Sequence, residues 1–475
     1  MKEDKNERHT EPIPDRLIQL ELYEAERRKY RRKRRLRNQM ISYLVALVVI
    51  AGLVAATDFG VRKLLEGVGD RSRIEAQEPA APPEDEIPSV DETPEEEEPE
   101  EEEVEEEPVV EEAPELDALG MMVESCIAEL TLEDKVAGLF FITPEALTGV
   151  NRAVRAGEAT KEKLAEYPVG GVVYFTRNIR NASYLKEMLK NTESWSKYPI
   201  FLAVDEEGGR ISRLAESRLA KNVGPMADIG ATIDPQNAQD ASEKIAKYLA
   251  DFGFNTNFAP VADILKYEGN ETIGDRSFGT DPRVVSLMVA AYVKGLKENG
   301  VYATLKHFPG LGNSNTDTHA GMAVTESTLE EMRAADFLPF TSGIEAGAEF
   351  VMVSHISVPN IVGDNTPASL SEKMISEVLR GELGFNGIVI TDALDMGAIS
   401  EYYTSEEAAV KAIKAGADML LMPENFAEAY EGLLAAVKSG QISEERINES
   451  LRRIYRVKYA DQVEVVGAES EGEQQ

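Results

Sequence analysis

The chain contains few cysteines and few histidines, and these low numbers limit the disulfides and the metal sites that it can form. Cys126 is its one cysteine in 475 residues, so an intramolecular disulfide is impossible. Cysteine usage therefore neither supports nor excludes export from the cell. The four histidines stand at positions 9, 307, 319 and 355, without a metal-binding spacing such as His-Glu-x-x-His. We predict that the protein holds no metal and no other cofactor.

Positive charge is missing from one long stretch. Residues 75–117 contain 22 Asp or Glu and not one Lys or Arg, whereas the whole chain has a formal net charge of −36. Without this stretch about −14 remains, which is an ordinary acidic surface. The large excess of acidic residues is therefore confined to one segment. The negative net charge argues against nucleic-acid binding by the protein as a whole.

Two other features lie before the acidic stretch. Nine of the eleven residues from Arg27 to Arg37 are basic, and the eighteen residues Met40–Thr57 carry no charge. A helix that rises ~1.5 Å per residue over this length is near the lower limit for crossing a hydrocarbon core of ~30 Å. Basic residues mark the cytoplasmic side of such helices. We predict a basic cytoplasmic segment at 1–38, a single-pass transmembrane signal anchor at 39–57, and an extracellular location for the rest of the chain.

Two alternatives to an uncleaved anchor remain open. A buried core helix is seldom preceded by so dense a basic block. A cleaved signal peptide would have a basic region of about 39 residues before its apolar part, which is longer than usual. The basic block would also bind anionic lipid headgroups.

The segment at 58–116 combines proline with an unbroken run of like charge. Such a chain buries too little apolar surface to fold, and its self-repulsion keeps it extended. We predict a disordered acidic linker that holds a domain off the membrane, with a metal-binding or partner-binding acidic segment as the alternative. A second disordered segment is predicted for the polar tail at 464–475.

Residues 117–463 alternate short apolar runs with longer helical patterns. The eight runs are VAGLFFIT (136–143), GGVVYF (170–175), PIFLAVD (199–205), FNTNFAPVADI (254–264), ATLKHFPG (303–310), FVMVSHI (350–356), GIVITDAL (387–394) and DMLLM (418–422). Continuous apolar strands between helices indicate a parallel sheet that is covered on both faces. Eight such units in roughly 340 residues favour an α/β fold, a closed (β/α)8 TIM-like barrel, over an open doubly wound sheet.

Polar residues follow several of these runs. A barrel of this type has its active site at the C-terminal ends of its strands, where Asp205, His307, His355 and Asp392 are expected. The third histidine, His319, lies just beyond the fifth run. One histidine in a folded domain is as often a core or surface residue as a functional one. Three at one rim favour an active site.

The residues from Lys306 to His319, KHFPGLGNSNTDTH, resemble the signature of glycoside hydrolase family 3, in its β-N-acetylhexosaminidase subgroup. The family pattern is Lys-His, Phe or Ile, Pro-Gly, His or Leu, Gly, four residues, Asp, Ser or Thr, His, and every position matches. The segments VDEEGGRISR (204–213), GDRSFG (274–279) and ITDALDMGAI (390–399) are similar to family segments in the same order. The resemblance covers residues 120–425. It implies the single-domain form, because only about fifty residues follow the last predicted strand.

Retaining cleavage of a glycoside needs a carboxylate nucleophile and a proton donor for the leaving oxygen. Asp392 is the predicted nucleophile, from its position at the rim and from its match to the family's nucleophile. Asp395 is the rival, although a turn beyond the strand would point it elsewhere.

Asp317 and His319 are the predicted acid/base pair. A carboxylate that binds one imidazole nitrogen fixes the tautomer and raises the basicity of the other nitrogen. The histidine can then protonate the leaving group and later activate water, and the resemblance implies the same dyad. The alternative is a loop cap and a surface histidine.

Five residues are candidate ligands of the substrate: Asp205, Arg213, Arg276, Lys306 and His307. Lys306 and His307 can donate to sugar hydroxyls, as the resemblance implies, and Asp205 can accept from two adjacent hydroxyls. Each has a structural alternative. Arg276 could pair with Asp275 or Asp281, and Asp205 could cap a loop.

These residues predict an exo-acting β-N-acetylhexosaminidase, a monomeric barrel anchored in the cell membrane that releases N-acetylglucosamine from peptidoglycan-derived glycans. The wall substrate rests on location and family analogy, not on a residue that would recognise it. A β-glucosidase remains open, and so does a phosphorylase, since a histidine acid/base does not repel phosphate. A catalytically inactive wall-binding protein is the third alternative, against which the complete set of site residues argues.

Overall fold

The computed structural model describes residues 116–267, 269–314 and 323–472. The predicted cytoplasmic segment, the anchor and the linker up to residue 115 lie outside the described residues. Within the described ranges no helix is long and apolar enough to span a membrane. Helix α17 (Glu444–Gly472) continues through most of 464–475, where the sequence predicts a disordered tail.

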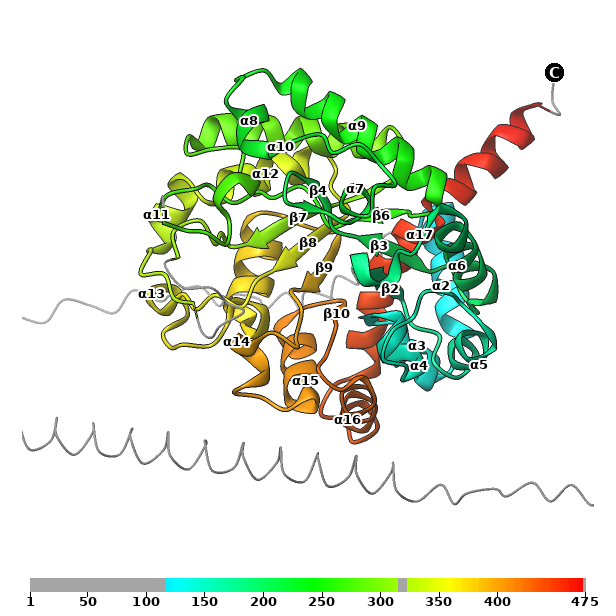
Figure 1. Cartoon of the computed structure of the whole chain (residues 1–475). Coiled ribbons are helices and arrows are strands. Elements are labelled where there is room, and N and C mark those ends of the chain that lie inside the picture. Colours follow the sequence, from blue (N-terminus) through cyan, green and yellow to red (C-terminus); the bar gives the residue numbers. More distant parts are fainter. Residues whose placement is uncertain (1–115, 268, 315–322, 473–475) are drawn as a thin grey trace, which may run out of the picture. The chain divides into compact units, whose positions relative to one another are not determined.

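Eight strands lie at the centre of the domain (Figure 1). Their bounds are β1 (Phe140–Ile142), β2 (Gly171–Tyr174), β3 (Phe201–Val204), β6 (Thr256–Asn257), β7 (Tyr302–Phe308), β8 (Phe350–Val353), β9 (Ile388–Thr391) and β10 (Leu420–Leu421). Each coincides with one of the eight predicted runs.

The eight strands form one parallel sheet that nearly closes on itself. Their order is β10-β1-β2-β3-β6-β7-β8-β9, with parallel pairing at every step. The two end strands are joined by a parallel bridge between Ile390 and Met419, and the Thr391 N–H donates to the Met419 carbonyl at 3.1 Å. The predicted barrel is therefore confirmed.

Aromatic rings fill the interior of the barrel. Phe201 of β3 and Phe350 of β8 have ring centroids 5.0 Å apart, although β6 and β7 separate their strands in the sheet. The ring of Phe141, from β1, lies 6.3 Å from Phe201 and 5.3 Å from Phe258. Rings from strands that are not neighbours meet only across the inside of the sheet. The barrel is a packed core and not a pore.

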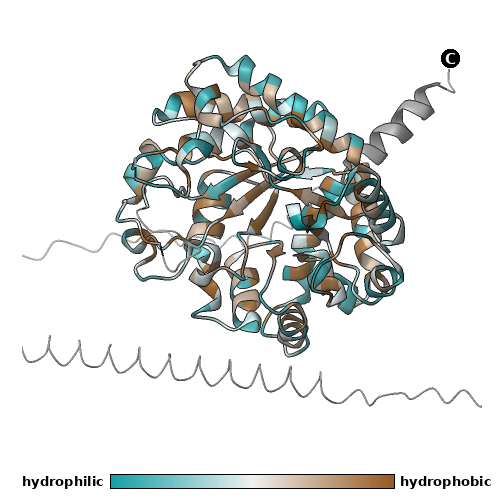
Figure 2. Ribbon diagram, viewed as in Figure 1, coloured by the Kyte–Doolittle hydropathy of each residue, from teal (hydrophilic) through white to brown (hydrophobic). Residues whose placement is uncertain are grey.

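Helices surround the strands and turn their polar faces outwards (Figures 1 and 2). The helices and short helical turns are α2 (Ala118–Ala128), α3 (Leu132–Ala137), α4 (Pro144–Thr148), α5 (Glu158–Glu166), η1 (Thr176–Asn178), α6 (Ala182–Trp195), α7 (Arg213–Glu216), α8 (Met226–Gly230), α9 (Pro235–Phe252), η2 (Gly274–Arg276), α10 (Pro282–Lys297), α11 (Leu329–Ala334), α12 (Phe337–Glu345), α13 (Pro359–Val362), η3 (Ala368–Leu370), η4 (Lys373–Glu382), α14 (Gly397–Ser400), α15 (Ser405–Ala415), α16 (Phe426–Lys438) and α17.

Local sequence signals explain where several of these helices begin. Helices α9 and α10 start with proline directly after Asp234 and Asp281, whose carboxylates accept from backbone N–H groups two residues on. The helical segment that follows β7 is divided into α11 and α12. The division falls at Ala335, whose φ of −141° is not helical, beside the buried Asp336.

The C-terminal helix covers the end of the barrel at which the strands begin. Asp418, which lies just before β10, is fully buried and pairs with Arg453 of α17 at 3.1 Å. Lys458 of α17 donates to the Gly170 carbonyl at 3.0 Å, and its ammonium lies 4.6 Å from the centre of the Phe201 ring. Helix α17 therefore closes the floor beneath the aromatic core.

Candidate active site

The opposite end of the barrel, where the strands finish, carries the predicted site residues that the structure describes. These are Asp205, Arg213, Arg276, Lys306, His307 and Asp392. Asp205 directly follows β3, Lys306 and His307 lie near the end of β7, and Asp392 directly follows β9. The predicted acid/base pair, Asp317 and His319, lies outside the described residues.

A small antiparallel hairpin after β3, which the sequence did not suggest, shapes one side of this rim. It consists of β4 (Glu206–Gly208) and β5 (Ile211–Ser212). Its turn contains Gly208 and Gly209 at φ values of 106° and 57°, a conformation that glycine adopts without strain. The hairpin leads directly into α7, which begins with Arg213.

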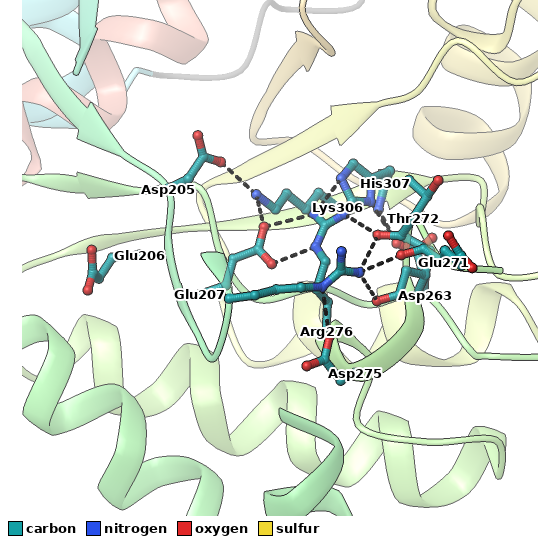
Figure 3. A network of polar contacts seen from close by, with 12 residues as sticks. Asp205, Glu206, Glu207, Asp263, Glu271, Thr272, Asp275, Arg276, Lys306 and His307 are labelled. Atoms are coloured by element: carbon teal, nitrogen blue, oxygen red, sulfur yellow. Dashed lines mark hydrogen bonds and ion pairs between the residues drawn. The ribbon is translucent and has the colours of Figure 1, made fainter. Parts of the chain in front are cut away.

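Glu207 of this hairpin is the centre of a buried charge network (Figure 3). Its two carboxylate oxygens accept from Arg276 Nε and Nη2, both at 2.8 Å, and the ammonium of Lys306 lies 2.6 Å from Oε1. Burial opposes the charge of Glu207, but the two cations hold the pKa of its carboxyl well below the usual range. Glu207 therefore fixes two of the predicted sugar ligands, and sequence reasoning missed it.

The partners of Arg276 differ from those that the sequence suggested as alternatives. Asp275 pairs with Arg210 at 2.8 Å, and Asp281 lies 3.7 Å from Arg283. Arg276 turns instead to Glu207, inside the site. Asp205, for which a loop cap was the alternative, accepts from the Lys306 ammonium at 2.8 Å. Both residues thus face the rim.

His307 is held by a carboxylate behind it. Arginine side chains only donate hydrogen bonds, so His307 Nε2, 3.2 Å from Arg276 Nη2, is the acceptor. Its Nδ1 then carries the proton and donates to Asp263 Oδ2 at 2.7 Å. Asp263 is fully buried and also accepts from the Leu311 N–H at 2.6 Å. The imidazole is therefore fixed in one orientation.

Asp392 is partly buried at the end of β9. Its backbone N–H donates to the Val353 carbonyl at 2.8 Å, and its Oδ1 accepts from the Ala393 N–H at 2.8 Å. Burial alone would raise the pKa of Asp392, but the polar surroundings of its carboxylate, which include His307, His355, the Ala393 N–H and Lys306, lower it below its ordinary value. The carboxylate is therefore ionised at neutral pH. Asp395, the rival nucleophile, is exposed.

His355 is buried and satisfied by the protein. Its Nε2 donates to the Ala393 carbonyl at 2.9 Å, and its Nδ1 lies 2.7 Å from Ser369 Oγ. It therefore ties the loop after β8 to the residue that follows Asp392. Its place at the rim is as predicted, but these contacts make it a positioning residue.

Glu206 lies apart from the charge network (Figure 3) and supports the helix that carries Arg213. It is fully buried, and its carboxylate accepts from the Leu214 N–H at 2.8 Å and from the Tyr248 hydroxyl at 2.9 Å. Burial raises the pKa of Glu206 to about 7. The two adjacent glutamates thus have opposite electrostatic environments, because successive residues of a strand point to opposite faces.

The raised pKa of Glu206 predicts a pH-dependent stability. Between pH ~4.5 and ~7 the folded protein binds this proton and the unfolded chain does not, so its contribution to stability falls as pH rises. Glutamine mimics the protonated acid and does not titrate. We expect the free energy of unfolding of the wild type, relative to Glu206→Gln, to fall by about 1–3 kcal/mol from pH 4.5 to pH 7.5. Urea unfolding at both pH values measures it, and a constant difference would contradict the assignment.

The described rim combines the ionised carboxylate of Asp392 with a set of fixed donors and acceptors. Lys306 and Arg276 donate, and Asp205 accepts, which suits a ligand with many hydroxyl groups. Across 116–267, 269–314 and 323–472, no group of three or more His, Cys, Asp or Glu is placed to hold a metal ion. An ionised carboxylate in such a setting can act chemically as a nucleophile or as a general base.

Comparison with known proteins gives a consistent relationship. The family model described as the glycosyl hydrolase family 3 N-terminal domain matches residues 131–457. A β-hexosaminidase of Stenotrophomonas maltophilia is 40% identical over 274 residues, which are 56% of this chain and 80% of that protein. β-Hexosaminidase A of Pseudoalteromonas piscicida is 32% identical over 325 residues and 62% of this chain. The chain spans about half, 54%, of that relative's length.

A solved structure is also similar to a large part of the chain. The family 3 β-N-acetylglucosaminidase of Paenibacillus sp. superposes with a TM-score of 0.64 at 35% sequence identity. The alignment covers 70% of this chain and 63% of that one. The family match over residues 131–457 spans all eight strands of the barrel.

Proposed function

Because the chain belongs to glycoside hydrolase family 3, we propose that it is a retaining exo-β-N-acetylhexosaminidase that releases terminal N-acetylglucosamine from a glycan. The predicted family and the prediction of a glycoside hydrolase are confirmed by the match over residues 131–457. The names of the relatives, β-hexosaminidase and β-N-acetylglucosaminidase, support the choice of sugar.

In the proposed reaction the carboxylate of Asp392 attacks the anomeric carbon of the terminal sugar. The bond to the leaving oxygen breaks, His319 gives that oxygen a proton, and a glycosyl ester of Asp392 forms. Water then attacks the same carbon, His319 takes a proton from it, and the ester bond breaks to restore the carboxylate. Asp317 holds the imidazole in the required tautomer. The assignment of Asp317 and His319 rests on the sequence motif.

The observation that carries the proposal is the ionised Asp392 beside a set of fixed sugar-binding groups. Lys306 and Asp205 are bound to each other at 2.8 Å, and Glu207 orients Arg276, so no large side-chain movement is needed to present them. Preorganised donors and acceptors lower the cost of placing the terminal sugar over the nucleophile.

The activity is tested with the purified full-length protein and 4-nitrophenyl N-acetyl-β-glucosaminide, with and without phosphate. We expect release of nitrophenol and free N-acetylglucosamine at a rate that phosphate does not change. Formation of a sugar 1-phosphate would instead identify a phosphorylase. Cleavage of the matching glucoside alone would identify a β-glucosidase, and no turnover of either substrate would favour a wall-binding protein.

The proposed cellular setting is the outer face of the membrane, with the barrel held by the predicted anchor and the acidic linker. There the abundant β-N-acetylhexosaminide would be the N-acetylglucosamine of peptidoglycan. This setting rests on the sequence of residues 1–116. Mass spectrometry of the products released from muropeptides tests it, and intact muropeptides after incubation would contradict it.

A further inference from the structure

Four exposed arginines gather at the rim of the barrel beside the candidate site. Residues 117–463 contain 50 Asp or Glu and 33 Lys or Arg, so the domain as a whole is acidic. Yet residues 146–157 and 167–186, which include the loops after β1 and β2, contain no acidic residue. These loops carry Arg152, Arg155, Arg177 and Arg180, all exposed. We call these four the arginine rim.

Specific contacts hold the two loops together. The Asn178 side chain donates to Glu145 Oε1 at 2.7 Å and to the Ala153 carbonyl at 2.9 Å. Arg152 Nε donates to the carbonyl of Arg177 at 2.7 Å. The arginine rim is therefore one built surface and not a chance scatter of side chains.

Two aromatic rings brace the guanidinium groups. Arg155 lies 3.8 Å from the centre of the Tyr184 ring, and Arg180 lies 5.1 Å from it. Arg177 lies 5.6 Å from the centre of the Phe175 ring. Stacking on an aromatic face leaves the edge of a guanidinium free to donate to an anion.

The arginine rim is continuous with the substrate site. Arg213 lies 5.7 Å from the centre of the same Phe175 ring, and its guanidinium is 3.9 Å from Asp205. Phe175 thus joins Arg177 to a predicted sugar ligand. In addition, Thr176 donates to Glu216 of α7 at 2.6 Å, which fixes the loop after β2 against the helix of Arg213.

Most of this positive charge is not neutralised by the protein. Among the described residues, Arg177 is the one of the four with an ion pair, to Glu145 at 3.5 Å. Glu216 of α7, which Thr176 contacts, is ion-paired with none of the four in the part of the chain that the structure describes. A surface with several fixed, uncompensated guanidinium groups is suited to carboxylates, which accept two parallel hydrogen bonds from arginine.

We propose that the arginine rim recognises carboxylate groups on the leaving-group side of the substrate, so that the preferred substrate is an acidic glycan. The proposal rests on the proposed function. In exo cleavage the terminal sugar binds at Asp392, and the remainder of the chain must cross the rim. The carboxylate of a sugar acid next to the scissile bond then lies within reach of the arginine rim. A neutral glycan has no carboxylate to bind there.

The test is a pair of substrates that differ only in charge. We choose N-acetylglucosamine β-1,4-linked to N-acetylmuramic acid, and the methyl ester of the same disaccharide. At low salt we expect the wild type to cleave the acid roughly tenfold more efficiently, in kcat/KM, than the ester. The preference should weaken at high salt, because exposed charges are screened.

The variant R152Q/R155Q/R177Q/R180Q should lose this preference, with a ratio near one. The ratio of kcat/KM for the acid to kcat/KM for the ester does not depend on the fraction of active protein. Partial unfolding of the variant therefore cannot produce the loss of preference. The matched control, K244Q/K247Q/R283Q/K294Q, removes the same charge from exposed positions of α9 and α10. It should keep the wild-type ratio.

Two results would overturn the proposal: a wild-type ratio near one, or a preference that survives in the four-arginine variant. Cleavage of the nitrophenyl substrate without cleavage of either disaccharide would do so as well. Failure to cleave the nitrophenyl substrate would be different, because it would refute the proposed function itself.

Discussion

The Asp392→Ala variant is expected to lose turnover, with kcat lower by at least about 10⁴-fold, because it lacks the carboxylate that forms the proposed glycosyl ester. The measurement is nitrophenol release from 4-nitrophenyl N-acetyl-β-glucosaminide. The fold should survive, since the Asp392 carboxylate makes one described hydrogen bond, to the adjacent Ala393 N–H. Thermal unfolding of both proteins checks this.

The matched control for this prediction is Asp395→Ala. It removes an equally charged residue three positions later, but from an exposed site. We expect kcat within about threefold of the wild type. A second measurement adds azide to Asp392→Ala. A small anion in the vacated space should restore turnover and give the glycosyl azide of inverted configuration. Turnover near the wild-type rate without azide would refute Asp392 as the nucleophile.

Glu207→Gln is expected to have the largest effect on stability. The change leaves Arg276 and Lys306 buried without the carboxylate that binds them both, and breaking such a pair costs about 3–5 kcal/mol. Urea unfolding at neutral pH measures the loss. We also expect kcat/KM to fall by about 10²-fold or more where the variant remains folded, since misplaced binding groups cost catalysis.

The chain contains a matched control for this change as well. Glu382 binds Arg333 through two parallel hydrogen bonds of 2.6 and 2.7 Å, the same arrangement as Glu207 and Arg276. The difference is exposure, because the side chains of Arg333 and Glu382 are 51% and 32% exposed, against 11% and 2% for Arg276 and Glu207. Glu382→Gln should therefore cost at most about 1 kcal/mol. Equal losses in the two variants would show that burial does not set the effect.

The fold was largely predictable because the sequence patterns that indicate its strands and helices are local. Each strand is a short apolar run between helical patterns, and parallel strands buried on both faces need no other information to be recognised. The same logic placed Asp205, Lys306 and Asp392 at one rim, since all parallel strands of a barrel finish on the same side. Their roles in the reaction stay predictions.

The supporting residues of the site were not predictable in the same way. Glu206 and Glu207 are adjacent residues of the same type, so the sequence does not distinguish their roles. The hairpin decides which of them faces Arg276 and Lys306. In the sequence Asp263 is only one residue of the apolar run at 254–264. Its part in orienting His307 depends on a pairing between residues 44 positions apart, which no local pattern encodes.

The aromatic core and α17 have a consequence for how a long glycan would be degraded. A barrel filled by Phe141, Phe201 and Phe350 and covered below by α17 has a single mouth. A polymer cannot thread through it, so the freed monosaccharide has to leave by the way it came. The shortened glycan must therefore dissociate before the monosaccharide can leave. We therefore expect distributive rather than processive trimming, with inhibition by the monosaccharide product.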